Sequence, residues 1–242
     1  MYIIEVLKNN NMLIDPYNRP VNYLRVSVTD RCDFRCQYCM AENMKFLPKK
    51  DLLSLDEIER ICTSFINLGT RKIRITGGEP LVRKNVMSLF KNLGVFINKK
   101  KLNELTLTTN GSQLEKYAEE LYEYGVRRIN VSVDTLKPNL FRELTRRGDL
   151  DKVLKGIEKA IKVGLKIKIN TVALKETNEF ELLDIMTWAH SNNCDITFIE
   201  TMPLGEIDID RTDQFLPLSK VKETLSKKYT LQNSKYYTGG PS

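Results

Sequence analysis

The feature that most constrains the fold of this 242-residue chain is a repeated order of short strands and longer helices. Apolar and polar residues alternate over six short segments, which predicts strands near 23–29, 72–76, 104–109, 127–133, 165–172 and 195–200. Helical periodicity fills the intervals and follows the last strand, near 54–68, 84–98, 113–124, 150–163, 178–192 and 218–228. Strands separated by helices pair in parallel, so the order predicts an α/β barrel or a doubly wound sheet.

Several helix ends are signalled locally. Ser54, with Glu57 three residues later, predicts a capping box at the start of a helix. Gly69, Gly125 and Gly164 each follow a helical segment where a C-terminal glycine cap belongs. With no low-complexity linker before about residue 205, we expect one barrel domain over 21–205, an N-terminal arm over 1–20 and a further region from 206 to 242.

One face of each strand is polar. Strands buried in a parallel sheet are usually apolar on both faces, yet here polar side chains alternate with the apolar ones: Arg25, Ser27, Lys72, Arg74, Thr106, Thr108, Asn130, Ser132, Lys168 and Asn170. Helices must cover the apolar faces, so the polar faces line a shared interior. A closed eight-stranded barrel fills its interior with branched apolar side chains, so the pattern favours a wide, incomplete barrel around a polar ligand. The alternative is an open antiparallel sheet with one wet face, which the intervening helices disfavour. Arg25, Arg74 and Lys168 indicate an anionic ligand.

Three of the five cysteines lie close together after the first strand. Cys32, Cys36 and Cys39 have the spacing C-x3-C-x2-C, which favours a soft metal centre over a disulfide framework. Zinc would need a fourth ligand, and the sequence holds no second C-x2-C or H-x3-H pair to supply one. A 4Fe–4S cluster held by three thiolates leaves one iron open for a small molecule. We interpret the two remaining cysteines, Cys62 and Cys194, as small core residues. We interpret Trp188 and His190 as structural residues.

The net charge of +7 is modest and spread out. Basic runs such as Arg127–Arg128 and Arg146–Arg147 are typical of solvated faces, so they do not indicate a nucleic-acid partner. No apolar run approaches the roughly 18 residues of a membrane span, and the first residues do not have the pattern of a secretory signal. We therefore expect a cytoplasmic protein with no membrane and no nucleic-acid partner.

The cysteine spacing, with Tyr38 between the second and third cysteine, resembles the signature of the radical S-adenosylmethionine superfamily. The resemblance implies that the open iron chelates the amino and carboxylate groups of S-adenosylmethionine, and that one electron then yields a 5′-deoxyadenosyl radical. Gly77-Gly78-Glu79-Pro80 resembles the superfamily segment that bonds the methionyl amino group through its backbone. By itself, a double glycine before Glu-Pro is only a turn.

Longer segments are similar to a narrower family, the GTP 3′,8-cyclases, or molybdenum cofactor biosynthesis protein A. The similarity is carried by 23–42, 72–81, 107–111, 129–134, 168–172 and 198–202, and extends over essentially 14–242. It implies a partial (β/α)6 TIM-type barrel and a lyase that converts GTP to (8S)-3′,8-cyclo-7,8-dihydroguanosine 5′-triphosphate. It also implies one 4Fe–4S cluster, S-adenosylmethionine, and an electron donor of flavodoxin or ferredoxin type, with a homodimer as one option for assembly.

The family roles transfer to matching residues. Cys32, Cys36 and Cys39 would hold the cluster, and no side chain would be catalytic, because the radical comes from the cluster and S-adenosylmethionine. The cofactor would be contacted by Tyr38, Gly78, Ser132 and Met202. GTP would be contacted by Arg25, Lys72, Arg74, Thr108 and Lys168. Ligand positioning or a local turn explains Asn110 and Asp134 equally well.

Two departures from the family bear on activity. Thr197 stands where the family commonly has an arginine, so one triphosphate contact is missing. The family's second iron–sulfur cluster, held in its C-terminal third by a C-x2-C pair and a later cysteine, has no counterpart, so we expect 206–242 to begin a truncated region. Such a core would load the first cluster but make little cyclised product. The competing hypotheses are a radical enzyme acting on a peptide or a deazapurine, and a non-catalytic iron–sulfur module.

Overall fold

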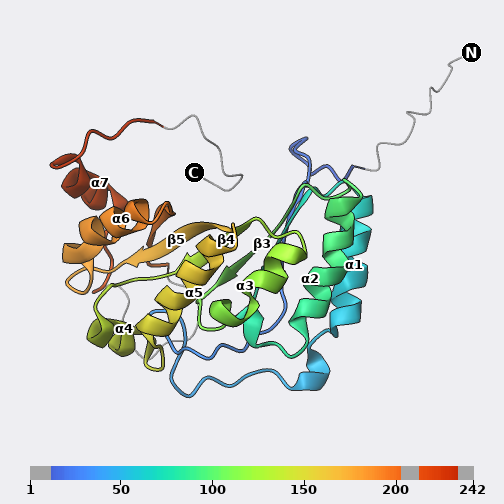
Figure 1. The fold of residues 1–242 in the computed structure, drawn as a ribbon, viewed down its shortest axis with the longest axis horizontal. Helices are drawn as coiled ribbons and strands as arrows, with labels where there is room; N and C mark the ends of the chain where they lie inside the picture. The colour runs from blue at the N-terminus through green and yellow to red at the C-terminus, as the bar shows by residue number, and fades with distance from the viewer. Residues whose placement is uncertain (1–11, 203–212, 234–242) are drawn as a thin grey trace, which may run out of the picture.

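The computed structural model describes residues 12–202 and 213–233. Its centre is a six-stranded sheet in which every neighbouring pair is parallel and the strand order follows the chain (Figure 1). The strands are β1 (Tyr23–Ser27), β2 (Lys72–Thr76), β3 (Glu104–Thr109), β4 (Arg128–Ser132), β5 (Lys166–Ala173) and β6 (Asp195–Glu200). This α/β arrangement confirms the predicted fold class and all six predicted strands. The predicted limit at 205/206 lies outside the described residues.

Helices follow the strands along the chain. They are α1 (Leu55–Asn67), α2 (Val86–Asn98), α3 (Leu114–Glu123), α4 (Pro138–Thr145), α5 (Leu150–Lys162), α6 (Leu182–Ser191) and α7 (Leu218–Ser226). Three short 3-10 helices lie at Lys49–Asp51, Pro80–Val82 and Glu179–Glu181. Of the seven α-helices in the described residues, six were predicted, whereas α4 was not. In the described part of the chain, no helix has the length and apolar character that crossing a membrane requires.

The predicted helix caps are present. The Ser54 hydroxyl accepts a bond from the Glu57 amide at 3.2 Å, and the Glu57 carboxylate accepts one from the Ser54 amide at 2.8 Å. Gly69 and Gly164 adopt φ of +101° and +94°, which is the left-handed conformation that glycine favours after a helix. Asn85 is also left-handed, with φ of +63°, so α2 begins at Val86 and not at 84 as predicted.

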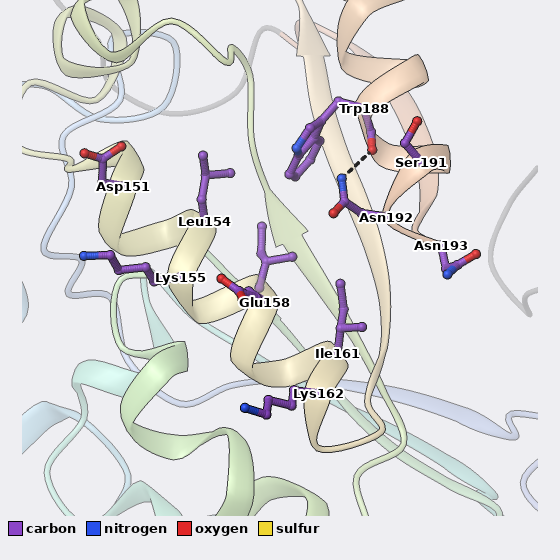
Figure 2. A pocket seen from close by; sticks show the side chains of 11 residues that line it. Asp151, Leu154, Lys155, Glu158, Ile161, Lys162, Trp188, Ser191, Asn192 and Asn193 are labelled. Carbon is purple, nitrogen blue, oxygen red and sulfur yellow. Dashed lines mark hydrogen bonds between the residues drawn. The ribbon is translucent and has the colours of Figure 1, made fainter.

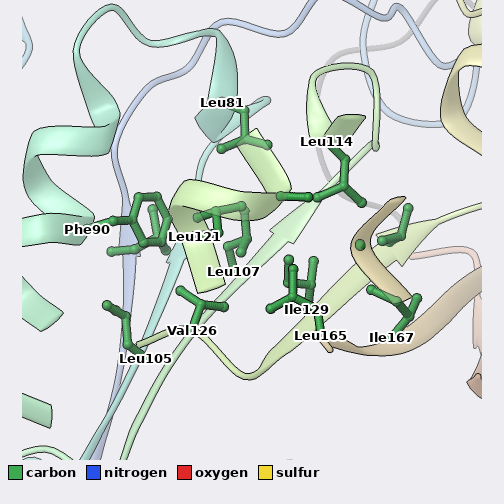
Figure 3. Packing of buried hydrophobic residues seen from close by; sticks show 14 of the residues in the cluster. Leu81, Phe90, Leu105, Leu107, Leu114, Leu121, Val126, Ile129, Leu165 and Ile167 are labelled. Atoms are coloured by element: carbon green, nitrogen blue, oxygen red, sulfur yellow. The ribbon is translucent and has the colours of Figure 1, made fainter. Parts of the chain in front are cut away.

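The apolar faces of the strands pack under the helices (Figure 3). Leu105 and Leu107 from β3, Ile129 from β4 and Phe90 from α2 are almost entirely buried. Each such side chain contributes roughly 1.5–3 kcal/mol when it leaves water. Two cysteines outside the cluster spacing are also buried in this layer, Cys62 and Cys194, which confirms their interpretation as core residues. The hydrophobic core therefore covers one face of the sheet, and the opposite face is left for the polar side chains of the strands.

The unpredicted helix α4 supports the cysteine loop. Its Phe141 ring meets the Phe34 ring edge to face, with the ring centres 5.9 Å apart. The amide of Arg35 donates to the Thr145 carbonyl at 2.9 Å, at the end of α4. Helix α4 thus fixes one side of the loop between β1 and α1.

Candidate active site

The three clustered cysteines lie in the loop that leaves β1. The amides of Cys39 and Met40 both donate to the Cys36 carbonyl, at 2.9 and 3.0 Å, so the last two cysteines share one turn. The Arg35 guanidinium donates to the Cys32 carbonyl at 2.5 Å. Burial raises the pKa of the Cys32 thiol to about 12 and that of Cys36 well above its usual value. These thiols ionise only beside a strong positive charge, which a bound metal centre provides.

The donor set fits an iron–sulfur cluster. Cys32, Cys36 and Cys39 are free thiols that lie in one loop. Thiolates are the ligands that hold 4Fe–4S clusters, and three of them leave one iron open. A structural zinc ion takes four protein ligands, whereas this loop offers three cysteines.

A second loop, after β2, packs directly on the cysteine loop. The Gly78 amide donates to the Thr29 carbonyl at 2.7 Å, and the Glu79 amide donates to the Arg31 carbonyl at 2.8 Å. A Cβ added at Gly78 would lie 2.3 Å from the Arg31 carbonyl oxygen, and one added at Gly77 would lie 2.6 Å from that of Thr29. Both glycines are therefore needed for the approach of the two loops. An amino group donates hydrogen bonds, so the carbonyl groups of this segment are the backbone groups that could accept the amino group of a cofactor.

Glu79 joins this second loop to the end of β3. Its side chain is fully buried and accepts bonds from the Leu81 amide at 3.0 Å, the Thr109 hydroxyl at 2.7 Å and the Asn110 amide at 2.6 Å. Burial raises the pKa of Glu79 to about 7, against the opposing effect of these donors. Glu79 is therefore a buried clamp within the Gly-Gly-Glu-Pro motif, although the motif alone predicted no role for its side chain.

Asn110 and Ser112 hold the start of the cysteine loop. The Asn110 carboxamide nitrogen donates to Asp33 Oδ1 at 2.7 Å and lies 3.7 Å from the Cys32 sulfur. Its oxygen accepts the Ser112 amide at 2.9 Å, and the Ser112 hydroxyl donates to Asp33 Oδ2 at 2.6 Å. The sequence places Asn110 at the end of a predicted strand, but it does not predict the roles of Asp33 and Ser112. These two residues are far apart in the sequence, so their hydrogen bond leaves no local pattern.

Tyr38 ties the cysteine loop to the far half of the sheet. Its hydroxyl donates to Asp134 Oδ2 at 2.5 Å, and Asp134 Oδ1 accepts the Val172 amide at 2.8 Å. Burial raises the pKa of Asp134 to about 6, partly offset by these two bonds. Asp134 therefore holds Tyr38 in place. The contact between the Tyr38 backbone and the cofactor stays a prediction.

The other predicted cofactor contacts lie at the same edge of the sheet. Gly78 follows β2, Ser132 ends β4 opposite Asn170, and Met202 follows β6 with its side chain 58% exposed. The carboxyl ends of parallel strands share one edge, where α/β barrels bind their ligands. The predicted positions are therefore brought to one rim, although they come from three separate strands.

Below this rim, the polar strand faces form rows across the sheet, defined by strand register. Arg25 of β1 lies opposite Arg74 of β2, and Thr106 of β3 lies opposite both Arg74 and Arg128 of β4. In the next row, Asn130 of β4 lies opposite two predicted GTP contacts, Thr108 of β3 and Lys168 of β5. Burial, and then the neighbouring cations, lower the pKa of both Arg74 and Lys168. The structure thus gathers the predicted cations on one polar face, which we call the lumen face.

Several polar groups of the lumen face are buried without a partner in the described residues. They are the Arg74 Nε, the Thr108 hydroxyl and the Asn130 carboxamide oxygen. A buried polar atom without a protein partner can be paired by water, an ion or a ligand. An orphaned guanidinium nitrogen among other cations is suited to an anion.

Lys72 differs from the other predicted phosphate contacts. Its ammonium pairs with Glu104 at 3.0 Å, and Arg128 pairs with the same carboxylate at 2.7 Å. Burial tends to raise the pKa of Glu104, but the bonds from Arg128 and Lys72 bring it below its usual value. The interpretation of Arg127–Arg128 as a solvated face was wrong for Arg128, which is 9% exposed, because it alternates in phase with Asn130 on the lumen face.

A groove in the described part of the chain lies elsewhere. It measures about 760 Å³ and runs between α5 and the end of α6, on the outer surface (Figure 2). Leu154, Ile161 and Trp188 line it beside mixed charges such as Lys162, and Asn192 closes one end with a 2.8 Å bond to the Trp188 carbonyl. It contains none of the predicted site residues, and its lining offers no cluster of like charge or of metal ligands.

Comparison with known proteins identifies the family. Residues 26–189 match the Radical SAM superfamily. The chain belongs to the Radical SAM superfamily. It is 60% identical over 230 residues to GTP 3′,8-cyclase of Sinorhizobium medicae and 63% identical to that of Rhizobium etli, covering 95% of this chain in each case. The chain spans 66% of the length of each of these two relatives.

Two solved structures have the same fold. Streptococcus suis SuiB bound to S-adenosylmethionine aligns with a TM-score of 0.67 at 21% identity, covering 85% of this chain and 47% of that one. Methylornithine synthase aligns with a TM-score of 0.62 at 15% identity, covering 84% and 60%. The partial TIM-type barrel predicted from the sequence is thereby confirmed.

Family membership makes a 4Fe–4S cluster and S-adenosylmethionine the cofactors of this radical SAM chain. The cysteine loop supplies the donor set that fits the cluster. The two remaining cysteines of the sequence, Cys62 and Cys194, are buried in the core.

Proposed function

We propose that this chain is the core of a GTP 3′,8-cyclase, which converts GTP to (8S)-3′,8-cyclo-7,8-dihydroguanosine 5′-triphosphate in molybdenum cofactor biosynthesis. The single observation that carries the substrate class is the lumen face, where Arg74 is half-buried with an unpartnered Nε beside Arg25, Arg128 and Lys168. The high identity to proteins named GTP 3′,8-cyclase supports the specific reaction.

The cations of the lumen face would bind the triphosphate. Arg25 and Arg74 are adjacent in register, so their two guanidinium groups can face the same string of phosphate oxygens. Lys168 of β5 adds a third positive charge, and it lies close enough to Arg74 for the Arg74 charge to lower the pKa of Lys168. Lys72 would contribute after its carboxylate partner, Glu104, is outcompeted by phosphate. The hydroxyl of Thr108, which has no protein partner among the described residues, is free to bond the nucleotide.

The rim residues would hold the cofactors above the nucleotide. Cys32, Cys36 and Cys39 would bind the cluster, which together with S-adenosylmethionine supplies one-electron radical chemistry when bound. A carbonyl near Gly78 would accept a hydrogen bond from the methionyl amino group, since an amino group donates. Tyr38, Ser132 and Met202 would orient the rest of S-adenosylmethionine. The nucleotide ribose would then lie between the rim and the cationic rows.

Two features limit the activity expected of this chain. Thr197, in place of the usual arginine, lies opposite Asn170 in register and brings no charge to the lumen face. The chain also spans only 66% of its relatives and has no cysteines for a second cluster. We therefore expect it to bind GTP and cleave S-adenosylmethionine slowly while forming little cyclised product. An electron donor of flavodoxin or ferredoxin type would reduce the cluster, and a homodimer remains a prediction for solution measurements.

The test is anaerobic reconstitution with iron and sulfide, followed by incubation with S-adenosylmethionine, GTP and dithionite. We expect 5′-deoxyadenosine to form, and GTP to bind with an affinity that Arg74→Ala and Lys168→Ala weaken. Lys162→Ala, on the outer face of α5, is the matched control and leaves binding unchanged. An intact affinity for GTP in both lumen variants would favour another substrate, such as a peptide or a deazapurine. No 5′-deoxyadenosine from cluster-loaded protein would favour a non-catalytic iron–sulfur module.

A further inference from the structure

The side chain of Asn110 reaches from the end of the sheet to a cysteine sulfur. It follows the last residue of β3, Thr109, at the rim that carries the cysteine loop. Its carboxamide nitrogen lies 3.7 Å from the Cys32 sulfur, within the range of an N–H···S hydrogen bond. Neither the cysteine spacing nor the Gly-Gly-Glu-Pro segment requires this contact.

The orientation of the Asn110 amide is fixed by its other partners. Its oxygen accepts the Ser112 amide at 2.9 Å, which leaves only the nitrogen to face the cysteine loop. The nitrogen also donates to Asp33 Oδ1 at 2.7 Å, and Asp33 is held from its other oxygen by the Ser112 hydroxyl at 2.6 Å. The backbone amide of Asn110 is in turn held by Glu79 at 2.6 Å. An amide turned by 180° would place its oxygen against the Asp33 carboxylate, so one orientation is strongly favoured.

We propose that Asn110 is a positioning residue that donates a hydrogen bond to the Cys32 thiolate and thereby raises the reduction potential of the cluster. Hydrogen bonds to the sulfur ligands and net local charge are two of the factors that set this potential. A donor offsets negative charge on the sulfur and so favours the reduced state. The Asp33 carboxylate, 4.0 Å from the same sulfur, has the opposite effect, which Asn110 moderates by bonding it as well. The inference rests on the cluster site of the proposed function and does not depend on GTP.

Three substitutions at this position and its neighbour separate the donor from the fold of the turn. Asn110→Ser keeps an oxygen that can accept the Ser112 amide but removes the donor to Cys32. Asn110→Asp is isosteric and replaces the donor by a charged oxygen facing both Cys32 and Asp33. Ser112→Ala is the matched control, because it removes one bond to Asp33 and leaves the Asn110 amide in place.

The experiment is a redox titration of the reconstituted full chain, followed by the electron paramagnetic resonance of the reduced cluster, with iron and sulfide measured for each protein. We expect the midpoint potential to become more negative in Asn110→Ser and more negative still in Asn110→Asp. It should shift less in Ser112→Ala than in Asn110→Ser, because Ser112 acts only through Asp33. An unshifted or more positive potential in cluster-loaded Asn110→Ser would overturn the proposal. So would loss of the cluster in Asn110→Ser but not in Ser112→Ala, because Asn110 would then be needed only for assembly. The titration contains no nucleotide, so its outcome is independent of whether GTP is the substrate.

Discussion

Two buried carboxylates at the rim of this barrel and three polar groups of its lumen face differ in how they are paired. At the rim, Glu79 has three protein donors and Asp134 has two. On the lumen face, the Arg74 Nε, the Thr108 hydroxyl and one Asn130 oxygen have none within the described residues. The rim is not fully paired, since Asp30 Oδ1, Arg31 Nε and Arg35 Nε of the cysteine loop also have no partner in the described residues. The contrast is therefore between the two rim carboxylates, whose bonds form on folding, and the three lumen groups, which we expect a ligand to pair. Four predictions test that contrast.

The largest effect is expected at the cysteines. Cys36→Ala removes one of three thiols at the rim, so the reconstituted protein should lose its cluster almost completely. Iron and sulfide content and visible absorption measure the loss. Cys194→Ala, which removes a thiol buried in the core, should keep the cluster. Equal iron in Cys36→Ala and the unchanged protein would remove Cys36 from the ligand set.

The second prediction concerns the contribution of the buried Glu79 carboxyl group to the free energy of unfolding. Its folded pKa of about 7 exceeds the usual 4.5, so its ionisation should lower the free energy of unfolding as pH rises from about 4.5 to about 7. The full effect is about 3 kcal/mol. Glu79→Gln removes this titration, so the difference in stability between the two proteins should change across that window in favour of the variant at higher pH. Denaturant unfolding from pH 4.5 to 8 measures it, and parallel pH profiles would contradict the assignment.

Arg74 should behave in the opposite way. Arg74→Ala removes a half-buried charge with an orphaned nitrogen, so the free energy of unfolding should hardly fall. GTP binding should weaken by about 10- to 100-fold, the range for a hydrogen bond to a charged group. Calorimetric titration with GTP and denaturant unfolding give the two values, with Lys162→Ala as the surface control. If Arg74→Ala strongly lowers the free energy of unfolding and leaves the affinity for GTP unchanged, Arg74 stabilises the fold and does not bind the nucleotide.

The smallest effect is expected at Glu104, the acid that forms ion pairs with two cations of the lumen face. Glu104→Gln releases Lys72 and Arg128 from its charge, so GTP should bind about threefold more tightly at low salt, and less so at high salt. Glu119→Gln, which breaks an exposed ion pair with Lys159, is the control and should not affect binding. Weaker binding in Glu104→Gln would mean that Glu104 orients Lys72 toward the nucleotide.

Much of this fold was predictable because its strands and helices are marked by period and by caps. The six strands and the capping box at Ser54 follow from patterns within a few residues of each other. Helix α4 was missed because Pro138–Thr145 spans only two turns, too short for a clear 3.6-residue period, and is followed closely by α5. The predicted helix near 178–192 is divided in the structure: Glu179–Glu181 form a 3-10 helix, and α6 begins at Leu182.

The candidate site was predictable only where a motif or an alternation marked it. Arg25, Arg74 and Lys168 could be found because they alternate with apolar neighbours on their strands. The alternation of β4 would have found Arg128 too, had the pair Arg127–Arg128 been assigned by strand face and not as a basic run. Asp33 and Ser112 could not be found, since their bond joins residues 79 positions apart. Contacts of that kind are set by the meeting of loops at the rim and not by local sequence.

The contact between the two glycines and the cysteine loop also constrains engineering of this scaffold. At Gly78 the obstacle to a side chain is main chain, the Arg31 carbonyl at 2.3 Å from an added Cβ, so no side-chain substitution elsewhere can make room. The two loops must therefore change together or not at all. A graft of the cysteine loop onto another barrel would have to carry residues 77–80 with it, and directed evolution that randomises either loop alone would recover mostly the starting sequence at these glycines.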